Sequence, residues 1–186
     1  IILPALTWST TVWPVIQMGL VPVYVDCDLH TFNMDSNKIE DAISNKTKAI
    51  FSVPIYGNPC EMDDILSICD KYNLMLIEDC CESMGARYKN KYVGSFGRVA
   101  SFSFYYSHHI TTLEGGICVT NDHDLSEMMR IVRAHGWVRQ VENREKWTNT
   151  YKDFDPKFLF VNDGYNLRIT EPQAAMGLLQ IDKIDG

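Results

Sequence analysis

The sequence lacks three features that would each indicate a class of protein. It has no apolar run near the roughly 20 residues that a membrane-spanning helix needs, and no charged-then-apolar leader opens it. Its formal net charge is −7, with no cluster of basic residues that would suit nucleic acid or an anionic membrane surface. These absences favour a cytoplasmic protein that binds neither nucleic acid nor a membrane.

The six cysteines also lack the C-x-x-C spacing that is typical of zinc and redox sites. Most of them stand inside apolar runs. The sequence therefore predicts reduced, mostly buried thiols and no metal site.

The pattern of apolar residues predicts the fold class. Short β-branched or apolar runs alternate with helix-length amphipathic segments, as in a mostly parallel sheet flanked by helices. The predicted strands are 21–25, 48–53, 74–78, 99–104 and 117–120. The predicted helices are 10–19, 36–44, 61–72, 122–134 and 170–184.

The organisation along the chain predicts one α/β domain over residues 1–186, because no repeat or Gly/Ser linker interrupts it. Residues 138–163 are polar and aromatic without a clean period, which predicts a long functional loop. Both ends of the chain lie in or beside amphipathic or apolar segments. We expect the chain to be an excerpt of a longer protein.

The first candidate functional residues follow the predicted strand 74–78. Asp79 comes directly after this run, and Glu82 stands three positions further on. Ligands of open α/β sheets bind beyond the carboxyl ends of the strands, where a carboxylate can hold a cationic ring nitrogen. The alternative is that Asp79 caps the following turn, and spacing alone favours the cap.

A second candidate cluster, of hydroxyl and imidazole groups, follows the strand 99–104. It contains Ser103, His108 and His109. Imidazoles can exchange protons near neutral pH, and they can also bind metals. Because neighbouring side chains on an extended segment point apart, the two histidines need not share a site, and paired metal ligation is not expected.

An ordered set of motifs along the chain carries a family resemblance. The motifs are Asp79 with Glu82, Gly85-Ala86, residues 93–97 (Val-Gly-Ser-Phe-Gly), Ser103-Phe104, Glu114-Gly115-Gly116 and residues 164–175. Together they resemble the DegT/DnrJ/EryC1/StrS sugar aminotransferase family. The resemblance implies the pyridoxal-phosphate-dependent transferase fold type I and a homodimer with shared active sites. It also implies that a phosphate loop and a C-terminal small domain lie outside this chain.

The same resemblance assigns residues to the cofactor, pyridoxal 5′-phosphate. Asp79 would pair with the pyridine nitrogen, Glu82 would lie near the ring hydroxyl, and Ser103 would bind the phosphate. Trp8 would stack on the ring, with packing in the core as an equally open alternative. Asn166 would reach the phosphate of the cofactor in the neighbouring subunit.

The sequence departs from the family's aminotransferases at position 108, where they carry the lysine that binds the cofactor covalently. His108 cannot form that bond, so the cofactor can remain as pyridoxamine 5′-phosphate. The change resembles the 3-dehydratase branch that acts on GDP-4-keto-6-deoxy-D-mannose in deoxysugar and O-antigen biosynthesis. This resemblance implies L-glutamate as amino donor, His108 as general base and acid, loss of water at C3 and release of ammonia.

Three alternatives remain open at the level of sequence. The CDP-4-keto-6-deoxyglucose branch also has histidine but needs cysteines for an iron–sulfur cluster, and residues 137–186 contain none. An ordinary sugar aminotransferase would need a lysine near position 108, and none stands between Lys91 and Lys146. A non-catalytic nucleotide-sugar sensor would explain the missing lysine but would leave Asp79 and Asn166 without a purpose.

Overall fold

The computed structural model describes residues 1–184, and the chain divides into two compact units. The first unit contains Ile1–Val119 and the segment from Met176 onwards, and the second contains Thr120–Ala175. The sequence pattern gave no sign of this division. Among residues 1–184, none of the helices combines the length and the apolar character needed to cross a membrane.

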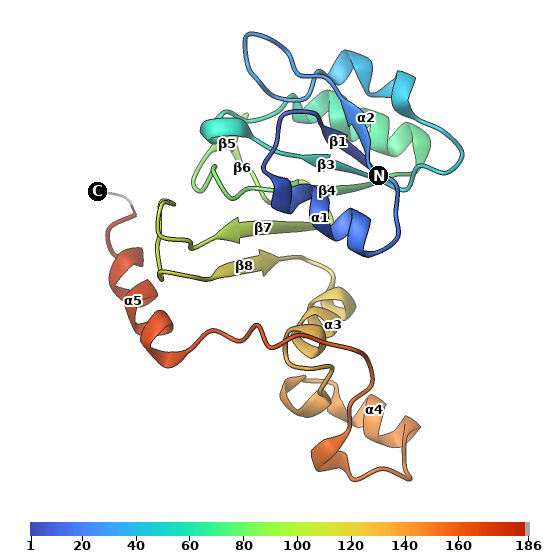
Figure 1. Cartoon of the computed structure of the whole chain (residues 1–186), viewed down its shortest axis with the longest axis vertical. Helices are drawn as coiled ribbons and strands as arrows, with labels where there is room; N and C mark the ends of the chain where they lie inside the picture. Colours follow the sequence, from blue (N-terminus) through green and yellow to red (C-terminus); the bar gives the residue numbers. More distant parts are fainter. Residues whose placement is uncertain (185–186) are drawn as a thin grey trace. The chain divides into compact units, whose positions relative to one another are not determined.

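A six-stranded sheet forms the centre of the first unit, with strand order β2-β1-β3-β4-β7-β8 (Figure 1). Its strands are β1 (Ile2–Pro4), β2 (Val23–Val25), β3 (Ala49–Ser52), β4 (Met75–Asp79), β7 (Val99–Ser103) and β8 (Gly116–Val119). All neighbouring pairs are parallel except β7 with β8. The short strands β5 (Arg87–Tyr88) and β6 (Lys91–Tyr92) form a separate antiparallel pair. The predicted fold class is confirmed, and β1, β5 and β6 are strands that the sequence did not predict.

The helices agree with four of the five predicted segments. They are α1 (Ser9–Gln17), α2 (Met62–Tyr72), α3 (His123–Arg133), α4 (Arg144–Thr150) and α5 (Glu171–Ile181). Five 3₁₀ turns are also present: η1 (Ser36–Lys38), η2 (Glu40–Ala42), η3 (Ile55–Gly57), η4 (Val138–Gln140) and η5 (Pro156–Phe158).

Two predictions about these segments were wrong. Residues 36–44 form η1 and η2 instead of an α-helix, and the Asp35 side chain accepts from the Asn37 amide where η1 begins. Isolated segments of this length gain little from helix propagation. The expected loop 138–163 contains α4, whose only apolar side chain, Trp147, packs on the core of the second unit. A single apolar residue gives no helical period to detect.

The alternation of side chains along β4 determines which residues meet on each face of the sheet. Leu76 packs with Ile50 and with Ile65 of α2 in the main core. Glu78 shares this face, because it stands two residues beyond Leu76. Asp79 points to the opposite face, where it meets Thr11 of α1. The helices α1 and α2 therefore cover opposite faces.

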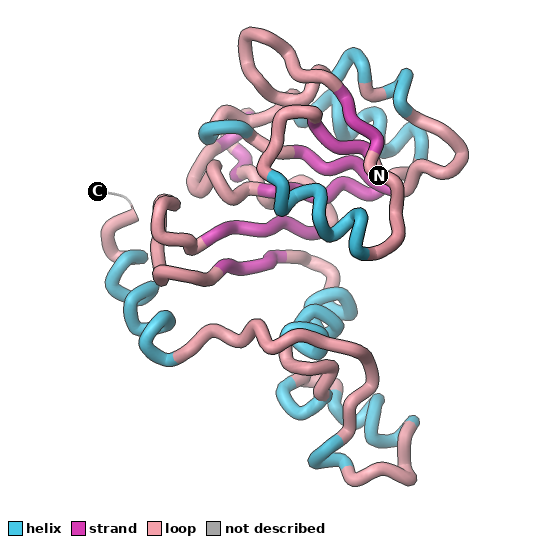
Figure 2. The backbone as a smooth tube through the Cα atoms, in the orientation of Figure 1, coloured by secondary structure: helices cyan, strands magenta, loops and turns pink. Residues whose placement is uncertain are grey.

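The carboxyl ends of four neighbouring parallel strands carry the segments of interest to one edge of the sheet. Trp8 follows β1, η3 follows β3, and Glu82 follows β4, while Ser103 ends β7 and the loop 104–115 follows it. Figure 2 shows this last segment as a loop that connects β7 to β8. This edge is where ligands bind in open α/β sheets.

All six cysteines are free. Cys60, Cys69 and Cys80 are buried, whereas Cys27 and Cys81 are half-buried and Cys118 is exposed. The expectation of mostly buried thiols is therefore right for half of them.

Candidate active site

Asp79 is half-buried and is held from two sides. Its Oδ2 accepts a hydrogen bond from the Thr11 hydroxyl at 2.7 Å, and its Oδ1 accepts from the Cys81 amide at 3.3 Å. The alternative in which Asp79 caps the following turn thus explains only the long bond from the Cys81 amide, and no helix begins at this turn. A carboxylate can accept about four hydrogen bonds, so Asp79 retains acceptor capacity for a ligand.

Thr11 is a site residue that the sequence analysis missed. It is buried, and its hydroxyl also accepts from the Thr7 hydroxyl at 2.9 Å, which forms a relay from Thr7 through Thr11 to Asp79. Thr11 is 68 positions from Asp79. No local pattern connects residues so far apart, so the contact depends on α1 packing across the end of β4.

The thiols beside Asp79 are kept protonated by their surroundings. Burial, followed by the negative charge of Asp79, raises the pKa of the Cys81 thiol to about 12. Burial also raises the pKa of Cys80, with Glu78 as the next cause. Since the thiolate is the nucleophilic form of cysteine, neither side chain is a nucleophile near neutral pH.

Glu82 is fixed by the turn that follows β3. Its Oε2 accepts from the backbone amide of Tyr56 at 3.0 Å. Tyr56 adopts a left-handed conformation with φ 51° and ψ 31°. This conformation costs an ordinary residue roughly 1–2 kcal/mol, so the surrounding structure must hold the turn in place.

The loop after β7 holds Ser103 and His108 at the same edge of the sheet. The Ser103 hydroxyl accepts from the Tyr105 amide at 3.2 Å, which leaves its O–H free to donate. The His108 amide donates to the Tyr105 carbonyl at 3.1 Å, and the two rings meet edge to face at 6.3 Å between centroids. His108 is half-buried, whereas His109 is exposed.

Thr112 joins the two sides of the loop that carries His108. It is 1% exposed, its amide donates to the Phe104 carbonyl at 2.9 Å, and its hydroxyl donates to the Glu114 carbonyl at 2.8 Å. These bonds connect the two sides of the loop and so fix the backbone at the base of the turn that carries His108.

Trp8 and Asn166 lie in very different settings. Trp8 precedes α1 with 74% of its surface exposed, so it does not pack in the core of the described residues, and the stacking role remains a prediction. Asn166 belongs to the second unit, where it is exposed and pairs with Ala134 in an isolated bridge. Its role toward a neighbouring subunit also remains a prediction.

Glu78 is a second residue that the sequence analysis missed. It is 1% exposed and accepts from the amides of Gly94, Phe96 and Gly97 at 2.6–2.7 Å. A buried carboxylate that receives three backbone N–H groups fixes the loop that supplies them. The available signal was a glutamate inside an apolar strand, followed by a Gly-x-x-Gly segment.

The donor set at this edge suits a particular kind of ligand. Asp79 offers an anionic group, Trp8 an exposed aromatic face, and Ser103 a hydroxyl donor. Within residues 1–184, no three His, Cys, Asp or Glu side chains form a group that could hold a metal ion. The set fits a cationic heteroaromatic ring that bears a phosphate.

The fold and the edge site together define an α/β protein of the aminotransferase type, with a histidine in the loop after β7. The chain belongs to the DegT/DnrJ/EryC1/StrS aminotransferase family, whose model matches residues 1–186. The family resemblance drawn from the motifs is confirmed.

Known relatives agree with this membership. GDP-4-keto-6-deoxy-D-mannose 3-dehydratase of Escherichia coli O55:H7 is 43% identical over 186 residues, which cover 99% of this chain and 48% of the relative. GDP-perosamine synthase of Caulobacter vibrioides is 42% identical over 185 residues, which cover 100% of this chain and 46% of the relative. The chain thus spans about half the length of these curated relatives.

A solved structure confirms fold type I. The E. coli GDP-4-keto-6-deoxy-D-mannose-3-dehydratase with bound hydrated PLP superposes on this chain with a TM-score of 0.91 at 42% identity. The match covers 99% of this chain and 48% of that protein.

Proposed function

We propose that the intact protein is a 3-dehydratase of a nucleotide-linked 4-keto-6-deoxy sugar, with GDP-4-keto-6-deoxy-D-mannose as substrate. Its cofactor is pyridoxal or pyridoxamine 5′-phosphate, and L-glutamate is the amino donor. One observation carries the proposal: His108 stands in the loop after β7, and no lysine lies between Lys91 and Lys146. Relatives named as a dehydratase and as a perosamine synthase are 43% and 42% identical, so overall similarity does not choose between them.

The residues at the sheet edge would hold the cofactor without a covalent bond. Asp79 pairs with the protonated ring nitrogen, Trp8 stacks on the ring, and Ser103 donates to the phosphate. When bound, the cofactor supplies an electron sink for bond cleavage in the attached sugar. Dehydratase relatives with bound hydrated PLP and with a trapped PLP-glutamate geminal diamine support this choice of cofactor and amino donor.

His108 performs the proton transfers. A ring nitrogen of the neutral imidazole takes up a proton, and the protonated ring then donates it to the departing C3 hydroxyl group of the sugar. Histidine suits both steps because its ordinary pKa lies near neutral pH. The C3 hydroxyl leaves as water, and C3 is reduced by the two electrons that glutamate supplies through the cofactor. Glutamate becomes 2-oxoglutarate and its nitrogen leaves as ammonia, so the released sugar has one oxygen atom fewer.

The assembly and location belong to the same proposal. The protein works in the cytoplasm as a homodimer, in which Asn166 of one subunit reaches the cofactor phosphate in the other. Mixed dimers test this: subunits with Asp79→Ala and Asn166→Ala should together restore one working site. A dimer of wild-type and doubly substituted subunits should leave no complete site. Equal activity of the two mixtures would contradict a shared site.

The central experiment follows product mass. The intact protein is incubated with pyridoxal phosphate, L-glutamate and either GDP-linked or CDP-linked 4-keto-6-deoxy sugar. Loss of one oxygen atom from the GDP sugar, without gain of nitrogen, is the expected result. Gain of nitrogen would indicate an aminotransferase, turnover of the CDP sugar alone would indicate the other dehydratase branch, and no turnover would indicate a sensor.

Substitutions at position 108 test the role of the imidazole. His108→Asn should bind the cofactor but lose about 10²–10⁴-fold in dehydration rate, the usual contribution of an acid–base group. Borohydride should attach no cofactor at position 108 of the wild type, whereas His108→Lys should yield a reduced covalent adduct. An active His108→Asn protein would contradict the mechanism.

A further inference from the structure

Asn33 is a buried amide that joins two loops next to the candidate site. It is 3% exposed, and its Nδ2 donates to the carbonyls of Asn58 and Pro59 at 3.0 and 3.1 Å. Its Oδ1 accepts from the Ile55 amide at 3.0 Å. One side chain therefore holds both ends of the turn η3, which lies 22 to 26 positions further along the chain.

The turn that Asn33 holds is the one that reaches Glu82. Within it, Tyr56 is left-handed and 87% exposed, so its side chain contributes little packing to offset the backbone strain. Its amide nevertheless donates to Glu82 Oε2 at 3.0 Å. A Cβ on Gly57 would lie 3.5 Å from the Glu82 carbonyl, which places the turn against the Glu82 backbone as well.

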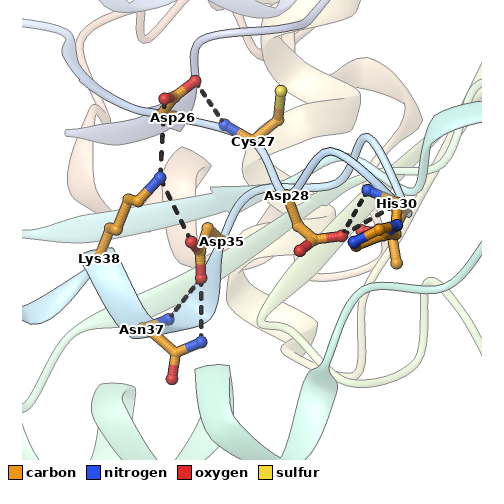
Figure 3. A network of polar contacts seen from close by, with 8 residues as sticks. Asp26, Cys27, Asp28, His30, Asp35, Asn37 and Lys38 are labelled. Carbon is orange, nitrogen blue, oxygen red and sulfur yellow. Dashed lines mark hydrogen bonds and ion pairs between the residues drawn. The ribbon is translucent and has the colours of Figure 1, made fainter.

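The loop that carries Asn33 is itself firmly anchored. Asp28 accepts from the amides of His30 and Thr31, both at 2.9 Å, and its own amide donates to the Asn33 carbonyl at 2.9 Å. Asp35 accepts from Asn37 and lies 3.4 Å from Lys38 in an ion pair. Figure 3 shows the contacts of Asp28 with His30 and those of Asp35 with Asn37 and Lys38. Asn33 thus lies in a loop that these contacts hold in place, and its side chain bonds the turn η3, in which Tyr56 is strained.

We propose that Asn33 is a positioning residue of the cofactor site: it fixes η3 so that the Tyr56 amide holds the Glu82 carboxylate in place. The inference rests on the proposed function, in which Glu82 lies near the ring hydroxyl of the cofactor. Asn33 acts on the cofactor through Tyr56 and Glu82. Replacing Asn33 should therefore change the affinity and the absorption band of the bound cofactor only when Glu82 is present.

A double-mutant cycle on the intact protein tests this dependence. The affinity for pyridoxamine phosphate and the absorption band of the bound cofactor are measured for wild type, Asn33→Asp, Glu82→Ala and the double variant. Asn33→Asp places carboxylate oxygens against two carbonyls and should weaken binding about tenfold with a shifted band, as expected when a hydrogen bond to a charged group is lost. In the Glu82→Ala background the same change should add less than about twofold. Equal effects in both backgrounds would overturn the proposal, as would an unchanged affinity in Asn33→Asp.

Ser36→Ala is the matched control. Ser36 is buried in the same loop, and its hydroxyl donates to Asp64 at 2.9 Å. This substitution should lower the melting temperature but leave the absorption band and the affinity unchanged. A shifted band in Ser36→Ala would show that general loosening of the loop is sufficient, and would overturn the specific role of Asn33.

Amide hydrogen exchange gives a test that needs no substitution of Asn33. In Glu82→Ala the Tyr56 amide should lose its protection, whereas the Asn58 amide, which donates to the Ile55 carbonyl at 2.9 Å, should keep its protection because Asn33 still holds the turn. Loss of protection at Asn58 would overturn the proposal. If wild type binds no pyridoxamine phosphate, the proposed function fails, while amide exchange compared between wild type and Asn33→Asp still decides whether Asn33 holds the turn.

Discussion

Glu78 and Asp79 are neighbours on β4, yet their carboxylates face opposite sides of the sheet and have different uses. Glu78 is enclosed, and backbone amides of Gly94, Phe96 and Gly97 meet its two oxygens at 2.6–2.7 Å. Asp79 is half-buried and accepts one hydroxyl and one long amide bond. The two carboxylates therefore differ in the bonding capacity that they leave unused, and this difference is the basis for proposing that Asp79 binds a ligand while Glu78 is structural.

The glycines around Glu78 show how this enclosure is achieved. A Cβ at Gly97 would lie 2.7 Å from the Leu76 carbonyl, and a Cβ at Gly94 would lie 2.5 Å from the Phe102 ring. A side chain at Gly97 would push the loop away from β4, and Gly94 has a positive φ of 83° that L side chains rarely adopt. The Gly-x-x-Gly spacing is therefore required for the loop to reach the carboxylate.

The largest expected effect comes from removing the enclosed carboxylate. Glu78→Ala leaves three buried amides without an acceptor and should lower the free energy of unfolding by about 3–5 kcal/mol. Urea unfolding followed by circular dichroism measures this change. Asp79→Asn should change the same quantity by less than about 1 kcal/mol, and equal losses in the two variants would contradict the division of roles.

Replacing Asp79, the half-buried carboxylate, should affect the reaction rate far more than stability. Asp79→Asn should slow the conversion of bound pyridoxal phosphate to pyridoxamine phosphate by glutamate about 10²–10³-fold, because the ring nitrogen loses its anionic partner. Stopped-flow absorbance measures the rate. Thr11→Val, which removes only the hydroxyl bonded to Asp79, should give a smaller loss, and Thr11→Ser should remain near wild type. Full activity of Asp79→Asn would restore the turn-capping role.

A smaller effect concerns the thiol beside Asp79. Burial and the negative charge of Asp79 raise the pKa of Cys81 to about 12, so alkylation by iodoacetamide at pH 8 should be slow and should accelerate as the pH rises. In Asp79→Asn the pKa of Cys81 should fall, and its alkylation should become severalfold faster. Peptide mapping by mass spectrometry measures this rate. Cys60, whose pKa burial raises to about 12 without Asp79 among the causes, is the internal control and should not change.

The smallest effect comes from an exposed carboxylate in a turn. Hydrogen bonds from the Thr31 and His30 amides lower the pKa of Asp28 from its ordinary value of 3.8. The charge therefore contributes stability above pH 3.8 that is lost as the pH falls through the lowered value. Asp28→Asn keeps an oxygen acceptor and should melt slightly below wild type at pH 6, with the difference vanishing in strong acid. A difference in melting temperature that grows in acid would contradict this sign.

Three of the site residues predicted from sequence, Asp79, Ser103 and His108, stand at or after the end of an apolar run. They were candidates because carboxyl ends of parallel strands meet at one edge of a sheet, whereas their roles toward the cofactor came from the family resemblance and remain predictions. Trp8 could not be separated from a core residue by its sequence context, and its 74% exposure decided the question.

The sequence by itself determined the fold class and most of the strands and helices. These features are local, because alternating polarity acts over a few neighbouring residues. The replacement of an expected lysine by His108 followed from the family resemblance. Only the tertiary structure decided that Thr11 meets Asp79, that Glu78 clamps residues 94–97, and that Asn33 supports the turn beneath Glu82. Such contacts join residues between 16 and 68 positions apart. They depend on which strands become neighbours and which face each side chain occupies, and no local pattern contains that information.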